Sequence, residues 1–239
     1  MDIQPTCLAI ADISGYTQFI RNRRTSLLHA EQIITDLLDA VIDQSQHPLL
    51  LNKLEGDAAL LYARCGSDPA RAAADVLGQA SRFFDAFQTR QNQLIKAGDG
   101  GCGCDACTGI GTLRLKVILH LGDVLIKRVR HFEELAGEPV IIVHRLLKNS
   151  VDADEYLLMT DAFYTASGCA TGEPRTEECN GFEHQQVRVI YPETTAPALV
   201  RHVSGSRLLP EVRSYWLSLR SHLGRLTRPG RRFTSLERL

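Results

Sequence analysis

The sequence contains no apolar stretch that approaches the ~20 residues a transmembrane helix needs. Its first residues also lack the pattern of a secretory signal, which is a basic segment followed by an apolar core. From these two absences we expect a cytoplasmic protein without a transmembrane segment. Internal repeats and long low-complexity segments are absent as well.

Basic and acidic residues are distributed unevenly along the 239 residues. Residues 199–239 contain nine Arg and two Glu but no Lys, which gives a net charge of +7. Residues 1–198 contain 18 Lys and Arg against 26 Asp and Glu, which gives −8. We therefore predict one domain over residues 1–198, long enough to bury a substantial core, and a basic tail over 199–239.

The predicted tail has the pattern of a basic amphipathic helix. Such a helix can lie on an anionic membrane surface, meet an acidic partner protein, or pack on the acidic body of its own chain or dimer mate. Nucleic-acid binding is disfavoured, because no fold signature of a nucleic-acid-binding module accompanies the arginines. The apolar stripe of this helix consists of Leu208, Val212, Tyr215, Trp216, Leu219, Leu223 and Leu226.

Hydrophobic periodicity over residues 1–198 predicts strands that alternate with helices. Residues 98–112 are expected to form a loop and residues 134–137 a turn. This order favours an α/β sandwich with helices on one face of the sheet. The predicted strands cover residues 7–11, 49–53, 57–63, 113–121, 124–129, 156–160 and 187–191. The first predicted helix has its apolar stripe over residues 27–42 and is expected to end near 46–48, and the other predicted helices cover 69–98, 140–149 and 161–166.

Two carboxylates stand at exposed ends of apolar segments. Asp12 directly follows the predicted buried strand, and Asp57 follows Gly56 in the turn of a predicted hairpin. A pair of carboxylates is a typical site for a hard cation such as Mg²⁺. The backbone N–H groups after Asp12 can in addition contact phosphates. These candidate phosphate contacts are Ile13, Ser14, Gly15, Tyr16 and Thr17.

Several short motifs follow one another in an order that resembles a known family. They are Asp12-Ile13-Ser14-Gly15-Tyr16-Thr17, Lys53-x-x-Gly56-Asp57, His120-x-Gly122, and Leu135-Ala136-Gly137 followed by Arg145. Together they resemble the catalytic domain of class III adenylyl and guanylyl cyclases over about residues 5–192. The similarity is greatest to a bacterial cyclase-like branch of unknown function that carries a Cys-x-Cys-x-x-Cys loop and a His-Arg-Leu-Leu-Lys-Asn helix.

This resemblance implies a ferredoxin-like fold with a mixed, mostly antiparallel sheet, and a head-to-tail homodimer with its sites at the interface. In such cyclases the two motif aspartates hold Mg²⁺ or Mn²⁺ on a nucleoside triphosphate, which assigns this role to Asp12 and Asp57. The resemblance also assigns recognition of the base to Lys53 with Glu134. It assigns stabilisation of the transition state to Arg145, supplied by the other protomer.

One position departs from the cyclase pattern. Ile141 stands where the family has an asparagine that positions the ribose, and isoleucine cannot form a side-chain hydrogen bond. A second, late phosphate-binding lysine also has no counterpart, since the last lysine is Lys148. Each lost contact of this kind typically costs ~10²–10³ in rate. Two hypotheses follow, namely a nucleotidyl cyclase and a catalytically degenerate module that binds a nucleotide or only dimerises.

Seven cysteines in a chain expected in the cytoplasm do not indicate disulfides. Cys102, Cys104 and Cys107 lie close together among glycines, which suits thiolate ligation of Zn²⁺ or of an iron–sulfur cluster. The alternative is a reduced, exposed loop without metal. Candidates for a fourth zinc ligand are Cys65, Cys169, Cys179 or a histidine.

Two histidines near these motifs receive no role from the sequence. His120 is expected on the exposed face of its strand, where a hydrogen-bonded surface histidine is more common than a catalytic base. His144 is expected to pack its helix against the rest of the domain.

Overall fold

A computed structural model describes residues 2–21, 27–99, 104–179 and 181–193 of the chain. The predicted domain boundary at residue 198, the basic tail and Cys102 lie outside these residues. Within the described ranges, none of the helices combines the length and the apolar composition needed to cross a membrane.

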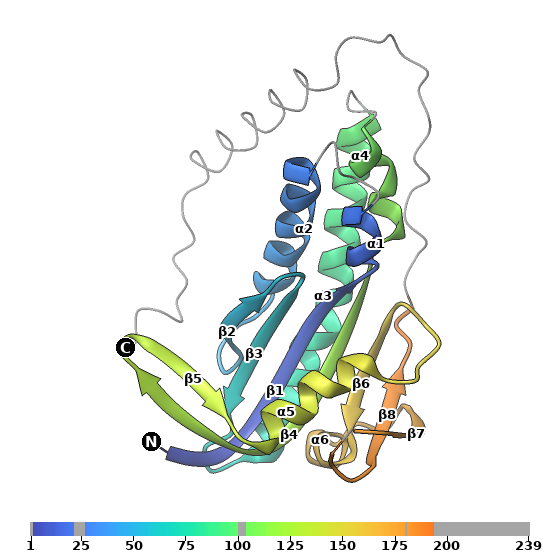
Figure 1. Ribbon diagram of the computed structural model, residues 1–239. Helices are drawn as coiled ribbons and strands as arrows, with labels where there is room; N and C mark the ends of the chain where they lie inside the picture. Colours follow the sequence, from blue (N-terminus) through green and yellow to red (C-terminus); the bar gives the residue numbers. More distant parts are fainter. Residues whose placement is uncertain (1, 22–26, 100–103, 180, 194–239) are drawn as a thin grey trace.

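The centre of the fold is an eight-stranded sheet in the order β2-β3-β1-β4-β6-β8-β7, with β5 paired to β4 (Figure 1). Among the described strands, β4 and β6 are the one parallel pair, and the other pairs are antiparallel. This confirms the predicted mixed, mostly antiparallel sheet. The strands are β1 (Asp2–Ser14), β2 (Leu50–Glu55), β3 (Ala58–Arg64), β4 (Arg114–Val129), β5 (Phe132–Ala136), β6 (Tyr156–Thr160), β7 (Glu173–Glu177) and β8 (Gln185–Ile190).

The helices agree closely with the hydrophobic periodicity. The longest begins at Pro69, and the Asp68 carboxylate accepts a hydrogen bond of 3.0 Å from the Arg71 N–H, which confirms the predicted helix cap. The helices are α1 (Tyr16–Arg21), α2 (Leu27–Ile42), α3 (Pro69–Asp99), α4 (Asp105–Gly109), α5 (Glu138–Arg145) and α6 (Asp161–Ser167), with 3₁₀ helices over Ile110–Thr112 and Leu146–Lys148.

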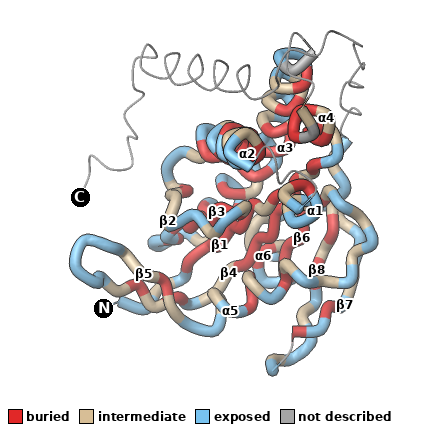
Figure 2. Tube along the Cα trace, turned by 45° about the horizontal axis from the view of Figure 1, so that its top comes forward, coloured by how far each residue is buried: buried red, intermediate tan, exposed pale blue. Residues whose placement is uncertain are grey.

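Both faces of the sheet are covered, which corrects the prediction of helices on one face. Alternate β1 side chains such as Cys7 and Ala9 join a core that also includes residues of α2, α3 and α6. The intervening residues Leu8 and Ile10 join a second core with Val143 of α5 on the opposite face. Figure 1 shows α5 crossing the sheet opposite α3, and Figure 2 shows the central strands as the most buried part of the molecule.

Several segments differ from the prediction: α1 and β7 were not predicted, and β1 extends beyond the predicted 7–11 at both ends. β4 runs without interruption through Gly122, where a break was expected, and Pro139 of α5 lies close to the strand at this glycine. A Cβ at Gly122 would lie 2.6 Å from the Pro139 Cγ, so the residue marks a close approach and not a turn. The predicted turn over residues 134–137 is largely strand β5, and the predicted loop over 98–112 contains α4.

His120 is also placed differently from the prediction. Its side chain is 6% exposed, because α5 covers the face of β4 that was expected to be in water. The ring Nδ1 lies 2.9 Å from the Thr160 hydroxyl of β6. Burial lowers the pKa of His120 to about 4, so the ring is neutral at pH 7.

Candidate functional site

Asp12 and Asp57 line one pocket of about 360 Å³ at the end of β1. The fold thus brings together the two carboxylates that the sequence places in different motifs. We call this the carboxylate pocket. It is lined by Asp12, Ile13, Ser14, Gly15, Tyr16, Thr17, Gln18, Asp57 and Lys116.

The β2–β3 hairpin holds Asp57 against the end of β1. Gly56 has a φ of +68°, a backbone conformation that glycine adopts without strain, and it makes the tight turn before Asp57. The Asp57 carbonyl then accepts a hydrogen bond of 3.1 Å from the Ile13 N–H. Asp12 itself pairs with Ala58 in the β1–β3 register, so both acids are fixed by backbone contacts.

Sequence reasoning missed two of these lining residues, Gln18 and Lys116, and Lys116 is the one that contacts a predicted carboxylate. It lies opposite Asp12 in the β1–β4 register, and its ammonium is 3.0 Å from an Asp12 carboxylate oxygen. The same ammonium donates to the Leu147 carbonyl at 3.4 Å. The alternation of apolar residues in β4 places Lys116 on the face away from α3. Its position beside Asp12 follows only from the β1–β4 register.

The two carboxylates repel each other inside the pocket. Partial burial raises the pKa of Asp57 to about 6, and the negative charge of Asp12 contributes in the same direction. Lys116 acts against this shift, but does not cancel it. Burial also raises the pKa of Tyr16, whose hydroxyl donates a hydrogen bond of 2.9 Å to Glu31 of α2.

This donor set fits a divalent cation of the hard type. Mg²⁺ and Mn²⁺ prefer carboxylate oxygens, and they typically bind through one or two carboxylates together with phosphate oxygens and water. A cation near Asp12 and Asp57 would also relieve their mutual repulsion. The residues that could hold such an ion are therefore Asp12 and Asp57, with Lys116 as a neighbouring positive charge.

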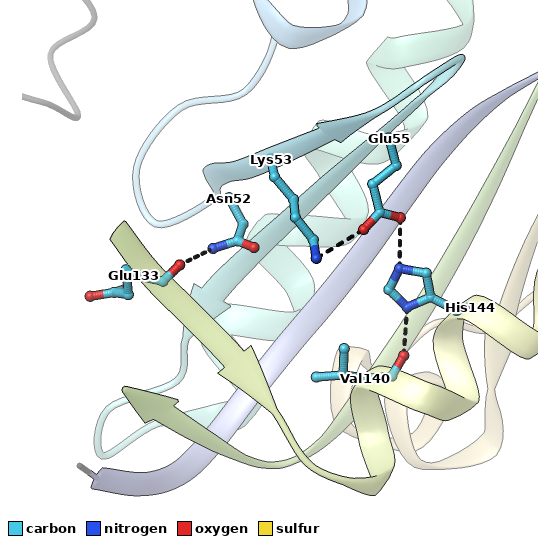
Figure 3. A network of polar contacts seen from close by, with 6 residues as sticks. All are labelled: Asn52, Lys53, Glu55, Glu133, Val140 and His144. Carbon is cyan, nitrogen blue, oxygen red and sulfur yellow. Dashed lines mark hydrogen bonds and ion pairs between the residues drawn. The ribbon is translucent and has the colours of Figure 1, made fainter. Parts of the chain in front are cut away.

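Lys53, the predicted base-reading residue, forms an ion pair with Glu55 of the same strand at 3.1 Å (Figure 3). His144 of α5 donates to the other Glu55 oxygen at 2.8 Å, and its second ring nitrogen contacts the Val140 carbonyl at 2.6 Å. Burial acts to raise the pKa of Glu55, but Lys53 and His144 outweigh it and the pKa is lowered. His144 therefore connects α5 to β2, a contact that the prediction of simple packing did not include.

Glu134, the predicted partner of Lys53, lies in β5 opposite Lys127 of β4. The neighbouring Glu133 makes the contacts that attach this hairpin to the sheet. Its carboxylate accepts hydrogen bonds from the Tyr62 hydroxyl and, at 2.7 Å, from Arg64. Its carbonyl accepts a bond of 2.8 Å from Asn52 of β2, as Figure 3 shows.

Arg145 does not line the carboxylate pocket. It is exposed at the end of α5, and its guanidinium lies 4.8 Å from the centre of the Phe182 ring. Ile141, one turn earlier in α5, is 44% exposed. Within one protomer the predicted metal ligands and the predicted transition-state arginine are therefore separate.

The cysteine loop meets a histidine from another element. His29 of α2 lies with its Nδ1 3.2 Å from the Cys104 Sγ, and the Cys107 Sγ lies 3.8 Å from the His29 Nε2. Cys65, Cys169 and Cys179 do not belong to this cluster. Cys65 instead lies 3.6 Å from Cys7, sulfur to sulfur. The sequence analysis allowed a histidine as a further zinc ligand but did not identify His29, because α2 and the cysteine loop are far apart along the chain.

A second hollow of about 410 Å³ lies over α2 and α3, where Asp43, Arg82 and Arg90 are among its lining residues. Arg90 is already paired with Asp36 at 2.9 Å. This hollow contains none of the motif residues, so the carboxylate pocket remains the candidate site.

Solved structures of class III cyclases share this fold. The guanylyl cyclase Cya2 superposes with a TM-score of 0.60 at 14% identity, covering 83% of this chain and 98% of that chain. The adenylyl cyclase CyaB from Pseudomonas aeruginosa gives 0.56 at 14% identity, covering 80% and 96%. A class III adenylyl cyclase-like ATP-binding protein from Pseudomonas aeruginosa gives 0.53 at 17% identity, covering 69% of this chain and 35% of that one.

Sequence comparison finds a nearer relative. The uncharacterized protein Rv2561/Rv2562 of Mycobacterium tuberculosis is 33% identical over 196 residues, which cover 80% of this chain and 89% of the relative. Residues 34–156 match the profile of a family described as protein of unknown function DUF2652. The chain therefore has a class III cyclase-type fold and belongs to the DUF2652 family.

Proposed function

We propose that this chain is a cyclase-like protein that binds a nucleoside triphosphate together with Mg²⁺ or Mn²⁺ in the carboxylate pocket of a homodimer. The convergence of Asp12, Asp57 and Lys116 in one pocket carries this proposal. The cyclase-type fold supports it, as does the description of one structural neighbour as an ATP-binding protein.

Asp12 and Asp57 would hold the cation, which would neutralise phosphate charge and lower the pKa of the ribose 3′-hydroxyl. Lys116 would leave the Asp12 carboxylate when the cation binds and pair with a phosphate oxygen. In this way Lys116 would supply a positive charge in place of the late lysine that the chain lacks. The residues 13–17 that line the pocket would pack against the triphosphate.

The homodimer is part of the proposal because one protomer does not contain a complete cyclase site. Arg145 would reach the phosphates only from a second chain, where its guanidinium could meet the charge that develops during transfer. In the protomer the exposed Arg145 guanidinium rests on the partly buried Phe182 ring, a contact worth on the order of 1 kcal/mol. Such a contact can be exchanged for a phosphate at little cost.

Two functions are candidates for this site. In the first, the chain converts the bound nucleotide to a cyclic monophosphate and pyrophosphate. In the second, the chain catalyses no reaction and acts as a nucleotide-binding or dimerising regulatory module. Ile141 favours the second, because its exposed side chain offers no hydrogen bond where cyclases position the ribose.

Incubation of the purified protein with each of the four nucleoside triphosphates and Mn²⁺ separates these candidates. Cyclic product and bound nucleotide would be measured in parallel for wild type, Asp57→Asn and Asp75→Asn. Asp75 is a matched control, because it is an exposed α3 carboxylate whose partner Arg71 lies 4.0 Å away.

We expect metal-dependent nucleotide binding by wild type and Asp75→Asn, and its loss in Asp57→Asn. Cyclic product that also disappears in Asp57→Asn would identify a cyclase and exclude the degenerate module. Retained binding without product would identify the module. Nucleotide binding that is independent of both metal and Asp57 would contradict the proposed site itself.

A further inference from the structure

His29, Cys104 and Cys107 place three potential metal ligands within 4.8 Å of one another, at a distance from the carboxylate pocket. We propose that they bind one Zn²⁺ ion that fastens α2 to α4. This second site does not depend on the proposed nucleotide function, since none of its residues lines the carboxylate pocket.

The two nitrogen–sulfur distances are close to those of a tetrahedral zinc site. Zinc binds sulfur at about 2.3 Å and histidine nitrogen at about 2.1 Å, so the two atoms lie about 3.6 Å apart in a tetrahedron. The His29 Nδ1 lies 3.2 Å from the Cys104 Sγ and 3.9 Å from the Cys107 Sγ. The Nδ1 therefore needs shifts of only a few tenths of an ångström to share one ion with both sulfurs.

The ligand types select the metal. Two thiolates with an imidazole favour Zn²⁺, whereas Mg²⁺ and Ca²⁺ prefer oxygen ligands. Binding would transfer the two thiol protons to solvent, because the thiolate is the form that coordinates. Three protein ligands leave a fourth position on the ion for water or another donor.

The surrounding structure holds Cys107 in place before any metal binds. Cys107 is buried in the core that lies between the sheet and the helices. The 3₁₀ helix that follows α4 is fixed to α3, because the Gln91 side chain donates to the carbonyls of Ile110 and Leu113 at 2.8 Å each. A site that is largely formed in advance binds its ion with less ordering of the chain.

The effect of the ion would be structural. His29 and Cys104 are far apart in sequence, so their joint ligation closes a long loop and stabilises the contact between α2 and α4. Glu31, two residues after His29 in α2, accepts the hydrogen bond from Tyr16 in the wall of the carboxylate pocket. Zinc would therefore also steady the first turns of the helix that supports this wall.

Metal analysis of the full chain, purified without chelator and without an immobilised-metal column, tests the proposal. We expect about one zinc per chain in wild type. The affinity for zinc should fall by more than about 100-fold in His29→Ala and in Cys104→Ser. This exceeds the loss that is typical when a residue hydrogen-bonded to a ligand is replaced. Cys169→Ser is the matched control, because Cys169 is a half-exposed thiol outside the cluster, and it should retain the zinc.

Three further tests cover the case in which a variant misfolds. His29→Cys replaces nitrogen by sulfur and should retain zinc, whereas a loss caused by misfolding would not be rescued in this way. Substitution by Co²⁺ should give the visible d–d bands of a tetrahedral centre and a thiolate charge-transfer band in wild type and His29→Cys. A chelator should lower the Tm of wild type but not that of Cys104→Ser.

Three results would overturn the proposal. The first is substoichiometric zinc in wild type together with no tetrahedral Co²⁺ spectrum. The second is zinc that stays bound after His29→Ala. The third is iron with acid-labile sulfide in place of zinc, which would identify an iron–sulfur cluster on the cysteine loop.

Discussion

The Lys116 ammonium lies 3.0 Å from the Asp12 carboxylate, and the two residues face each other across the β1–β4 register. Both side chains are mostly buried, with 20% and 14% of their side-chain surfaces exposed. Lys116 therefore balances the charge of Asp12 in the metal-free pocket and competes with any cation for the same oxygens.

Lys116→Met should separate these two effects. Without the competing ammonium, Mn²⁺ should bind the nucleotide-free protein more tightly, by about threefold to tenfold for a change of about 1 kcal/mol. Nucleoside triphosphate should bind more weakly by a similar factor, because a phosphate contact is lost. Calorimetric titration measures both. A change of the two affinities in the same direction would contradict the proposed exchange of partners.

Ile141→Asn should introduce a hydrogen-bonding side chain at the position that the resemblance to cyclases assigns to the ribose contact. Ile141 is 44% exposed, so the free energy of unfolding should change by no more than about 0.5 kcal/mol. If this contact alone limits turnover, formation of cyclic nucleotide should rise by about 10²-fold. The same assay on Ile3→Asn, an exposed isoleucine on β1, controls for the polarity of the surface.

Unchanged product formation in Ile141→Asn, with nucleotide binding intact, would show that this contact is not the limiting defect. The arrangement of Lys53 with Glu55 would then be the next feature to test, since the ion pair occupies the proposed base-reading lysine.

His120 should make the stability of the protein depend on pH. Burial lowers its pKa to about 4 in the folded chain, against 6.5 in the unfolded chain. Between these values the unfolded chain binds a proton that the folded chain does not, so the free energy of unfolding falls as the pH falls. The loss from pH 7.5 to pH 5 should be about 2 kcal/mol.

Urea unfolding of wild type and His120→Gln at both pH values measures this contribution. Glutamine can keep a hydrogen bond to Thr160 but does not titrate. The decrease in stability between pH 7.5 and pH 5 should therefore be about 2 kcal/mol smaller in His120→Gln. An equal decrease in both proteins would show that His120 is not the group responsible.

Glu133→Gln should loosen the β4–β5 hairpin. It replaces a carboxylate that accepts hydrogen bonds from Tyr62 and Arg64, and we expect a loss of ~1–2 kcal/mol in the free energy of unfolding. Glu134→Gln is the neighbouring control for stability, and it should stay within about 0.5 kcal/mol of wild type. Similar losses in the two variants would contradict the role assigned to Glu133.

The sequence predicts the fold well wherever a local sequence pattern determines the structure. The apolar run before Asp12 is buried at every position, and Gly56 makes the predicted turn. The α2 helix covers the predicted apolar stripe but ends at Ile42, before the predicted end near residue 46. Prediction fails where a distant element decides the environment. His120 was expected in water because nothing in β4 itself shows that α5 covers that face.

The candidate site was likewise predicted only in part. Asp12 and Asp57 were identified from their positions after a strand and within a turn, and the fold places them in one pocket. Lys116 and His29 were missed because each acts through a partner that lies far away in sequence. Only strand register places Lys116 at Asp12, and only helix packing places His29 beside Cys104.

The most direct test of the central claim is a crystal structure with Mn²⁺ and a nucleoside triphosphate that lacks the 3′-hydroxyl. We predict anomalous manganese density about 2.1 Å from carboxylate oxygens of Asp12 and Asp57, the usual distance for such hard cations. The triphosphate should contact this ion, and the Lys116 ammonium should have left Asp12. Nucleotide bound elsewhere, with the Lys116–Asp12 pair intact and no manganese between the carboxylates, would contradict the account.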